Sequence, residues 1–204
     1  NGRLGGALSV DGLNDYVLDP NAGDYLNGLD EITISMWVQS NELNTDKGFI
    51  SGIEPNGSDK FSLRYDADGI LGGGTNVIKG GLPTTDASNN VAFESQSNRQ
   101  TTNWQHVVLT WKQGQQPQMY IDGVVETPTF QGQHISGGPI VTSDPATGVL
   151  DGITMLYVGR GSKDIDSLSW NGLVDDVRIY KRALSSNEIS NLYVLATTEP
   201  HMFV

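Results

Sequence analysis

The chain of 204 residues contains no cysteine. This absence excludes disulfide bonds, cysteine-based zinc sites and thiol nucleophiles. In a secreted protein it fits a bacterial source better than a small domain stapled by disulfides. Long apolar runs are absent too, so the sequence predicts no membrane insertion, and no signal peptide is visible. Because the chain begins in a polar, glycine-rich stretch, we expect it to be one module of a longer protein.

Basic residues are scarce. The chain has 12 lysines and arginines against 24 aspartates and glutamates, which gives a formal net charge of −12. Such a chain repels nucleic acid and anionic membrane surfaces. The charge suits a saline, calcium-rich or extracellular setting, since carboxylates are the ligands that Ca²⁺ prefers. Simple solubility explains the same charge equally well.

Strand and turn patterns fill most of the sequence. The 25 glycines and the frequent Asn, Asp, Ser and Thr residues indicate many turns. Ile32 to Val38 alternates cleanly, and if both faces of that strand are covered, Trp37 belongs to the core. Met119 to Glu126 is the clearest hairpin, with Asp-Gly as its two-residue turn. Helical periodicity occurs only near the C-terminus, so we expect an all-β protein.

The stretch from Trp170 to Leu192 combines the last strand with the start of a helix. Ser185 and Glu188 form a capping box at that start. Within the strand, Asp175 falls on the same face as apolar residues. A carboxylate there is costly to bury unless another group pairs with it. The partner of Asp175 is therefore the main chemical question that the sequence raises.

Six motifs in order resemble the laminin-G-like domains of the concanavalin A-like lectin/glucanase superfamily. They are A-L-S-V-D-G-L-N-D-Y-V, I-T-I-S-M-W-V, N-W-Q-H-V-V-L-T-W, M-Y-I-D-G-V-V, L-Y-V-G-R and N-G-L-V-D-D-V-R-I-Y-K-R-A-L-S-S-N-E-I-S-N-L-Y. The resemblance implies a jelly-roll β-sandwich of two antiparallel sheets, with adjacent first and last strands and one short C-terminal helix. We predict one such domain over residues 1–196 and a tail or linker over residues 197–204.

The resemblance also implies a structural Ca²⁺ near the junction of the first and last strands. The matching positions are Asp11, Asp15 and Asp175, with Asn14 and Asp176 as alternatives. Oxygen ligands from distant segments can neutralise one another's charge only around a cation. The alternative is that Asp11 and Asp15 accept backbone N–H bonds in an Asx-type turn, while Asp175 pairs with an arginine.

Some relatives are enzymes, but their catalytic patterns are incomplete here. The E-x-D-x-E strand of the glucanase branch is missing, and the run that begins at Glu94 shares only its first residue. Gln133 and His134 echo the Gln and His of the alginate-lyase branch in the wrong order. His106, beside Trp104 in a strand, is expected to be structural, and no G-x-S-x-G motif supports a serine nucleophile. We therefore expect no catalytic activity.

Sugar sites commonly combine an aromatic platform with side chains that form bidentate hydrogen bonds. The loops between the predicted strands are the place to look for them, because loops often carry binding residues. Each candidate could equally be ordinary turn chemistry, and Asp164 and Asp166 could hold a second calcium ion. The candidate ligand-binding residues are Tyr65, Asp66, Asp68, Asn76 and Arg160.

The sequence thus predicts a calcium-associated, carbohydrate-binding module of a large extracellular bacterial protein, namely a surface adhesin. One alternative is a carbohydrate-binding module of a polysaccharide-degrading enzyme. Another is a non-catalytic laminin-G-like module that binds proteins. We expect a secreted or cell-surface location, glycans or polysaccharide as partners, and a monomeric module within its longer chain.

Overall fold

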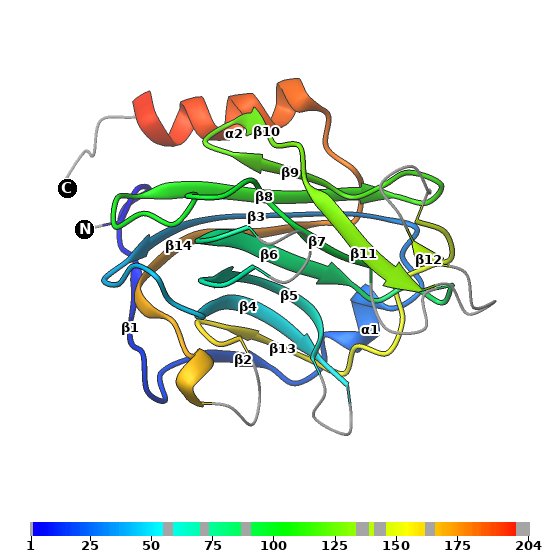
Figure 1. Ribbon diagram of the computed structural model, residues 1–204, viewed down its shortest axis with the longest axis horizontal. Helices are drawn as coiled ribbons and strands as arrows, with labels where there is room; N and C mark the ends of the chain where they lie inside the picture. The colour runs from blue at the N-terminus through cyan, green and yellow to red at the C-terminus, as the bar shows by residue number, and fades with distance from the viewer. Residues whose placement is uncertain are drawn as a thin grey trace.

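The computed structural model describes residues 2–54, 59–69, 74–86, 91–133, 139–140, 146–161 and 166–198. Within these ranges, the strands form two antiparallel sheets that pack face to face (Figure 1). Helix α2 lies along the outside of one sheet. The predicted all-β jelly-roll sandwich with one short C-terminal helix is therefore confirmed.

The first sheet has six strands, among them the first and the last strand of the chain. Its first and last strands pair antiparallel, with Leu8 opposite Val174. The Asp122-Gly123 turn has positive φ at both residues, which is the two-residue turn expected for the predicted hairpin. In spatial order the strands are β1 (Leu8–Asp11), β14 (Asn171–Tyr180), β3 (Glu31–Ser40), β8 (Gln105–Lys112), β9 (Gln118–Ile121) and β10 (Val124–Val125).

The second sheet has eight strands. A short helix, α1 (Gly23–Leu26), follows its edge strand β2, and a 3₁₀ turn, η1 (Asp166–Leu168), precedes β14. In spatial order the strands are β12 (Pro139–Ile140), β11 (Thr129–Gln133), β7 (Val91–Glu94), β6 (Val77–Leu82), β5 (Asp59–Asp66), β4 (Gly48–Ile53), β13 (Met155–Val158) and β2 (Val17–Asp19).

Three aromatic rings join the two sheets in the core. Phe49 and Tyr65 come from β4 and β5 of the second sheet, whereas Trp170 directly precedes β14 of the first. The Trp170 ring centroid lies 5.1 Å from that of Tyr65 and 5.2 Å from that of Phe49, in both cases edge to face. This geometry is the favourable one for aromatic pairs. All three side chains are fully buried.

Helix α2 (Ser186–Thr198) covers the outer face of the six-stranded sheet. The predicted capping box is present, because the Ser185 amide donates to Glu188 Oε2 at 2.9 Å and the Glu188 amide donates to Ser185 Oγ at 3.4 Å. The helix continues two residues into the predicted tail; the rest of that tail lies outside the described residues. No helix of the described chain has the length and apolar character needed to cross a bilayer.

The N-terminal segment and helix α2 both contact Trp37. The Arg3 guanidinium lies 4.7 Å from the Trp37 ring centroid, and the Tyr193 ring of α2 stacks on the same indole at 5.5 Å. Trp37 is consequently only 2% exposed, although it points away from the core between the sheets. The prediction that this residue is buried is confirmed, because the helix covers its face of the sheet.

Candidate functional site

Asp175 is paired with main-chain amides of the N-terminal segment. Its Oδ2 accepts hydrogen bonds from the amides of Arg3 at 2.6 Å and Leu4 at 2.9 Å, and its Oδ1 accepts one from Asp176 at 2.8 Å. The residue is only 9% exposed. Hydrogen bonds to a charged acceptor are stronger than neutral ones, so three of them offset the cost of burying the carboxylate. The backbone of Arg3, rather than its side chain, is the partner.

The strand register separates Asp175 from Asp11, another predicted calcium ligand. Asp11 lies opposite Asn171, which is four residues or about 13 Å along β14 from Asp175. Asp11 instead accepts the Leu13 amide at 2.9 Å, as the Asx-type alternative predicted. The register thus keeps Asp11 away from Asp175, and the described residues contain no group of three or more His, Cys, Asp or Glu side chains that could hold a metal ion.

Calcium binding by this protein stays a prediction. The alternative positions for a second ion, Asp164 and the side chain of Asp166, lie outside the described part of the chain. Gln133 ends β11, and His134 is likewise outside the described residues. His106 donates or accepts a hydrogen bond with Ser35 Oγ at 2.9 Å and is 1% exposed, as expected for a structural histidine.

Replacing Asp175 by alanine is expected to lower the free energy of unfolding by about 2 kcal/mol, because the partly buried amides of Arg3 and Leu4 lose their charged acceptor. Urea denaturation followed by circular dichroism measures this change. Asp11→Ala is the matched control, since Asp11 is an exposed carboxylate on the strand paired with β14; its effect should stay within about 0.5 kcal/mol.

The same samples with and without EDTA separate two roles for Asp175. If the carboxylate acts only through the N-terminal amides, EDTA leaves the difference between wild type and Asp175→Ala unchanged. A melting temperature that falls in EDTA for the wild type, but not for Asp175→Ala, would contradict this assignment and support a calcium ion at Asp175. An unchanged wild-type melting temperature would contradict the calcium prediction.

Two of the predicted ligand residues are buried in strand β5. Tyr65 is 0% exposed, because it alternates with Phe61 and Leu63 on the face that packs against the other sheet. It therefore cannot serve as a sugar platform, and that assignment is corrected to a core residue. Asp66 points to the opposite face, where its Oδ2 lies 2.8 Å from Arg64 Nη2 and 3.6 Å from Lys79 Nζ.

Of the other three predicted ligand residues, Asp68 and Asn76 lie together at the connection between β5 and β6, because the Asn76 backbone amide donates to the Ala67 carbonyl at 2.9 Å, whereas Arg160 lies apart from them. Asp68 is exposed beyond the end of β5. Asn76 adopts a positive φ of 54° before β6, and its side-chain amide donates to Asn44 Oδ1 at 2.7 Å. Arg160 is 8% exposed, with its guanidinium 5.1 Å from the Tyr16 ring centroid at the β2 edge. Since β13 and β4 separate β2 from β5, the five residues do not form one site.

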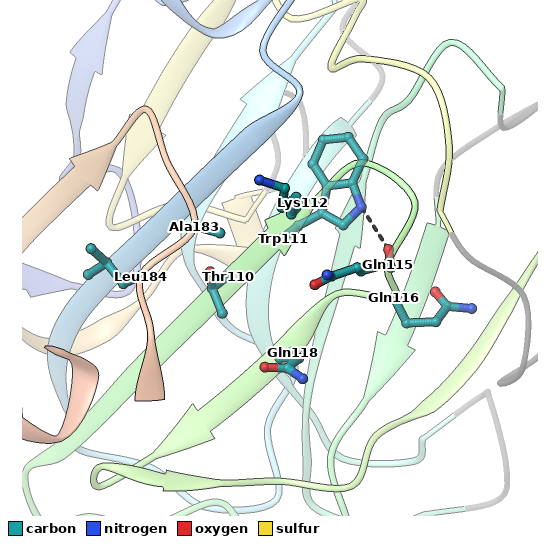
Figure 2. A pocket seen from close by; sticks show the side chains of 8 residues that line it. All are labelled: Thr110, Trp111, Lys112, Gln115, Gln116, Gln118, Ala183 and Leu184. Carbon is teal, nitrogen blue, oxygen red and sulfur yellow. Dashed lines mark hydrogen bonds between the residues drawn. The ribbon is translucent and has the colours of Figure 1, made fainter. Parts of the chain in front are cut away.

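A groove at the end of strand β8 is the strongest candidate site. Two adjoining hollows, with volumes of about 60 and 410 Å³, share Gln115, Gln116 and Gln118. We call them together the glutamine groove. Thr110, Trp111, Lys112, Ala183 and Leu184 complete the smaller hollow (Figure 2). Pro117, Val125, Glu126, Thr127, Pro128 and Phe130 complete the larger.

The turn between β8 and β9 is held rigidly in place. The Trp111 indole donates to the Gln115 carbonyl at 3.0 Å (Figure 2). The Gln115 carbonyl also accepts the Ala146 amide at 3.2 Å, and the Gly114 amide donates to the Ala146 carbonyl at 2.9 Å. Gly114 has a φ of 80°, a conformation that glycine adopts without strain. The glutamine side chains are therefore carried on a preformed backbone.

The glutamines supply neutral hydrogen-bonding groups to the groove. In Figure 2, the Gln115 side chain points toward Thr110, whereas Gln116 points away from it on the other side of the turn. Gln118 Oε1 accepts a hydrogen bond from the Tyr120 hydroxyl at 3.1 Å. The amide nitrogen of Gln118 makes no hydrogen bond within the described residues. Such an amide offers two N–H donors to a ligand.

The charged residues of the groove are paired. Lys112 Nζ bonds to Glu31 Oε1, which raises the pKa of Lys112 and lowers the pKa of Glu31. Glu126 forms a two-point contact with Arg99, with N···O distances of 3.0 and 2.9 Å. The two charged side chains of the groove lining, Lys112 and Glu126, are thus each held by a partner of opposite charge.

Sequence reasoning missed this groove. The available signal was the glutamine-rich turn K-Q-G-Q-Q-P-Q that follows the strand ending at Trp111. The other walls come from the segments at 125–130 and 183–184, which are distant in sequence. Only the folded chain brings these three segments together.

Comparisons with known proteins agree with the fold. Domain 4 of AbnA, an extracellular GH43 arabinanase from Geobacillus stearothermophilus, in complex with arabinotriose, matches 94% of this chain and 78% of its own, with 20% identity and a TM-score of 0.56. The CBM40 of a Ruminococcus gnavus sialidase, bound to α2,3-sialyllactose, matches 81% and 83%, with 14% identity and a TM-score of 0.57. A SAP-like pentraxin from Limulus polyphemus matches 94% and 87%, with 16% identity and a TM-score of 0.56.

A comparison with curated proteins found no match in sequence. The family profile described as the concanavalin A-like lectin/glucanases superfamily matches residues 11–190, which is most of the chain. This range covers the strands of both sheets except for the first three residues of β1. The chain belongs to the concanavalin A-like lectin/glucanases superfamily.

Proposed function

We propose that this protein is a non-catalytic carbohydrate-binding module and that the glutamine groove is its glycan site. One observation carries the proposal: a preformed groove of about 410 Å³ that combines glutamine amides with Phe130 and Pro128. Its volume falls within the range of roughly 300–1,000 Å³ that is usual for small-molecule sites. Amides match the donor and acceptor character of sugar hydroxyls, and the apolar residues offer surfaces for the C–H faces of a sugar ring.

Two structures of the same fold support the class of ligand. The AbnA domain is described with arabinotriose, and the CBM40 with sialyllactose. Since their identities to this chain are 20% and 14%, they support carbohydrate as the ligand class and leave the sugar to be determined by the groove itself.

We further propose an extracellular or cell-surface setting within a longer bacterial protein. The net charge of −12 and the absence of cysteine favour an adhesin over a polysaccharide-degrading enzyme as the parent. A laminin-G-like module that binds protein is the alternative of a different class. A glycan array probed in calcium and in EDTA tests these proposals, because signals that vanish in EDTA indicate calcium-dependent binding. Turnover of a polysaccharide by this protein would contradict the non-catalytic assignment.

The double variant Gln115→Ala/Gln118→Ala is expected to bind its glycan about 10- to 30-fold more weakly, because each amide hydrogen bond contributes about 1 kcal/mol. Isothermal titration calorimetry with a glycan identified on the array measures the change. Gln113→Ala is the matched control: Gln113 is an exposed glutamine of the same turn that does not line the groove.

Circular dichroism and melting temperature establish that the variants remain folded. An unchanged Kd in the folded double variant would place the glycan site elsewhere. Absence of any glycan signal on the array, with and without calcium, would contradict carbohydrate binding itself.

A further inference from the structure

The charges around the glutamine groove restrict which glycans it can take. Among the described residues that line either hollow, Lys112 of the smaller one is the one cationic side chain, and its Nζ is bonded to Glu31. Arg99, near the opposite end, is bound at two points by Glu126. A sugar carboxylate or sulfate would have to displace an existing carboxylate from either cation, so no net ion pair would be gained.

The wider field of the protein acts in the same direction. The chain carries a net charge of −12, and Glu126 belongs to the groove lining itself. A polyanionic glycan approaching this surface would be repelled, with a strength that depends on ionic strength. Uncharged sugars experience no such repulsion, and the amides of Gln115 and Gln118 need no charge on the ligand.

The shape of the groove favours a chain over a single sugar. The smaller hollow is bounded by Leu184, which follows the last strand of the six-stranded sheet. The larger hollow reaches Phe130 in β11 of the eight-stranded sheet. Both hollows are lined by Gln115, Gln116 and Gln118, so they adjoin at the turn between β8 and β9, one beside Leu184 and the other beside β11. A ligand that contacts both ends must be extended.

We infer that the glutamine groove binds an uncharged polysaccharide chain through amide hydrogen bonds, and discriminates against uronic, sialylated and sulfated glycans. This inference rests on the proposed function and narrows it to a class of substrate. Affinity is expected to rise at least about fivefold between the mono- and tetrasaccharide of a preferred glycan, as both hollows become filled.

The test is calorimetric titration of the intact chain with two matched sets of oligosaccharides. The neutral set contains tetrasaccharides of arabinan, xylan, mannan and β-glucan; the acidic set contains tetragalacturonate, an alginate tetramer and sialyllactose. Each is titrated at about 20 mM and about 300 mM NaCl, which spans strong and weak screening. We expect at least one neutral ligand to bind. Its Kd should change by less than about twofold between the two salt concentrations, and should rise by about tenfold or more in the Gln115→Ala/Gln118→Ala variant.

The outcomes distinguish a failure of the uncharged-ligand inference from a failure of the proposed carbohydrate binding. Tighter binding of an acidic glycan, with a Kd that rises steeply with salt and persists in the double variant, would overturn the uncharged-ligand inference while leaving carbohydrate binding intact. Binding of a monosaccharide as tight as that of its tetrasaccharide would overturn the extended-chain part. Failure of every neutral and acidic glycan to bind would instead overturn the proposed function.

Discussion

Replacing Trp170 with alanine is expected to lower the free energy of unfolding by about 4 kcal/mol, because truncating a fully buried tryptophan removes its packing and leaves a cavity. The side chain is 0% exposed and contacts Phe49 and Tyr65 edge to face. Its indole also donates to the Leu173 carbonyl at 3.2 Å. For a chain of this size, the melting temperature should fall by about 12 °C. Urea denaturation and calorimetry measure the two quantities.

Tyr65→Phe is the matched control in the same cluster. It keeps the ring but removes the hydroxyl that donates to Gln105 Oε1 at 3.1 Å, so a loss of only about 1 kcal/mol is expected. The pair of variants also checks the reassignment of Tyr65 from sugar platform to core residue. A loss below about 1 kcal/mol for Trp170→Ala would show that these rings do not join the sheets.

Acidification is expected to destabilise the protein through His106. Burial, and secondarily the positive charge of Arg178, lowers the pKa of His106 from 6.5 to about 4. His106 therefore becomes protonated below about pH 6.5 in the unfolded chain, but only below about pH 4 in the folded chain. Stability from this group is complete above pH 6.5, falls by about 2 kcal/mol at pH 5, and has fallen by about 3 kcal/mol at pH 4.

The pH dependence is measured as the difference between wild type and His106→Asn in urea at pH 7 and pH 5. Carboxylates contribute to both proteins alike, so the difference isolates this histidine. The stability of the variant, although lower at pH 7, should fall by about 2 kcal/mol less than that of the wild type. Parallel stability curves would show that His106 becomes protonated in the folded protein without cost.

Local patterns were sufficient to predict an all-β protein and several of its elements, whereas the jelly-roll arrangement was implied by the family resemblance. Alternation of Ile32 to Val38, the Asp122-Gly123 turn and the Ser185–Glu188 capping box each specify one element through short-range chemistry, and each is present in the structure. Trp37 was predicted to be buried if both faces of its strand were covered, and α2 covers the second face. These features depend on neighbours within a few residues or on a single packing contact.

The surroundings of the predicted site residues could not be predicted from residue types, because they depend on strand register and on backbone contacts. The resemblance implied that the first and last strands are adjacent, but the register that sets Asp11 about 13 Å from Asp175 is decided by pairing along the whole strand. The partners of Asp175 are backbone amides, which every residue except proline possesses, so no sequence motif marks them. Tyr65 was different: its alternation with Phe61 and Leu63 already indicated the core.

The contact of the N-terminal segment and helix α2 with Trp37 determines how the module would carry mechanical load. Trp37 lies opposite His106 near the start of β8, whereas the glutamine groove lies at the far end of that strand. Tension applied through Arg3 and Tyr193 therefore peels the N-terminal segment and α2 from one end of the sheet first. Leu184 of the smaller hollow lies two residues before α2 and would be reached last, whereas the residues of the larger hollow belong to other segments of the chain.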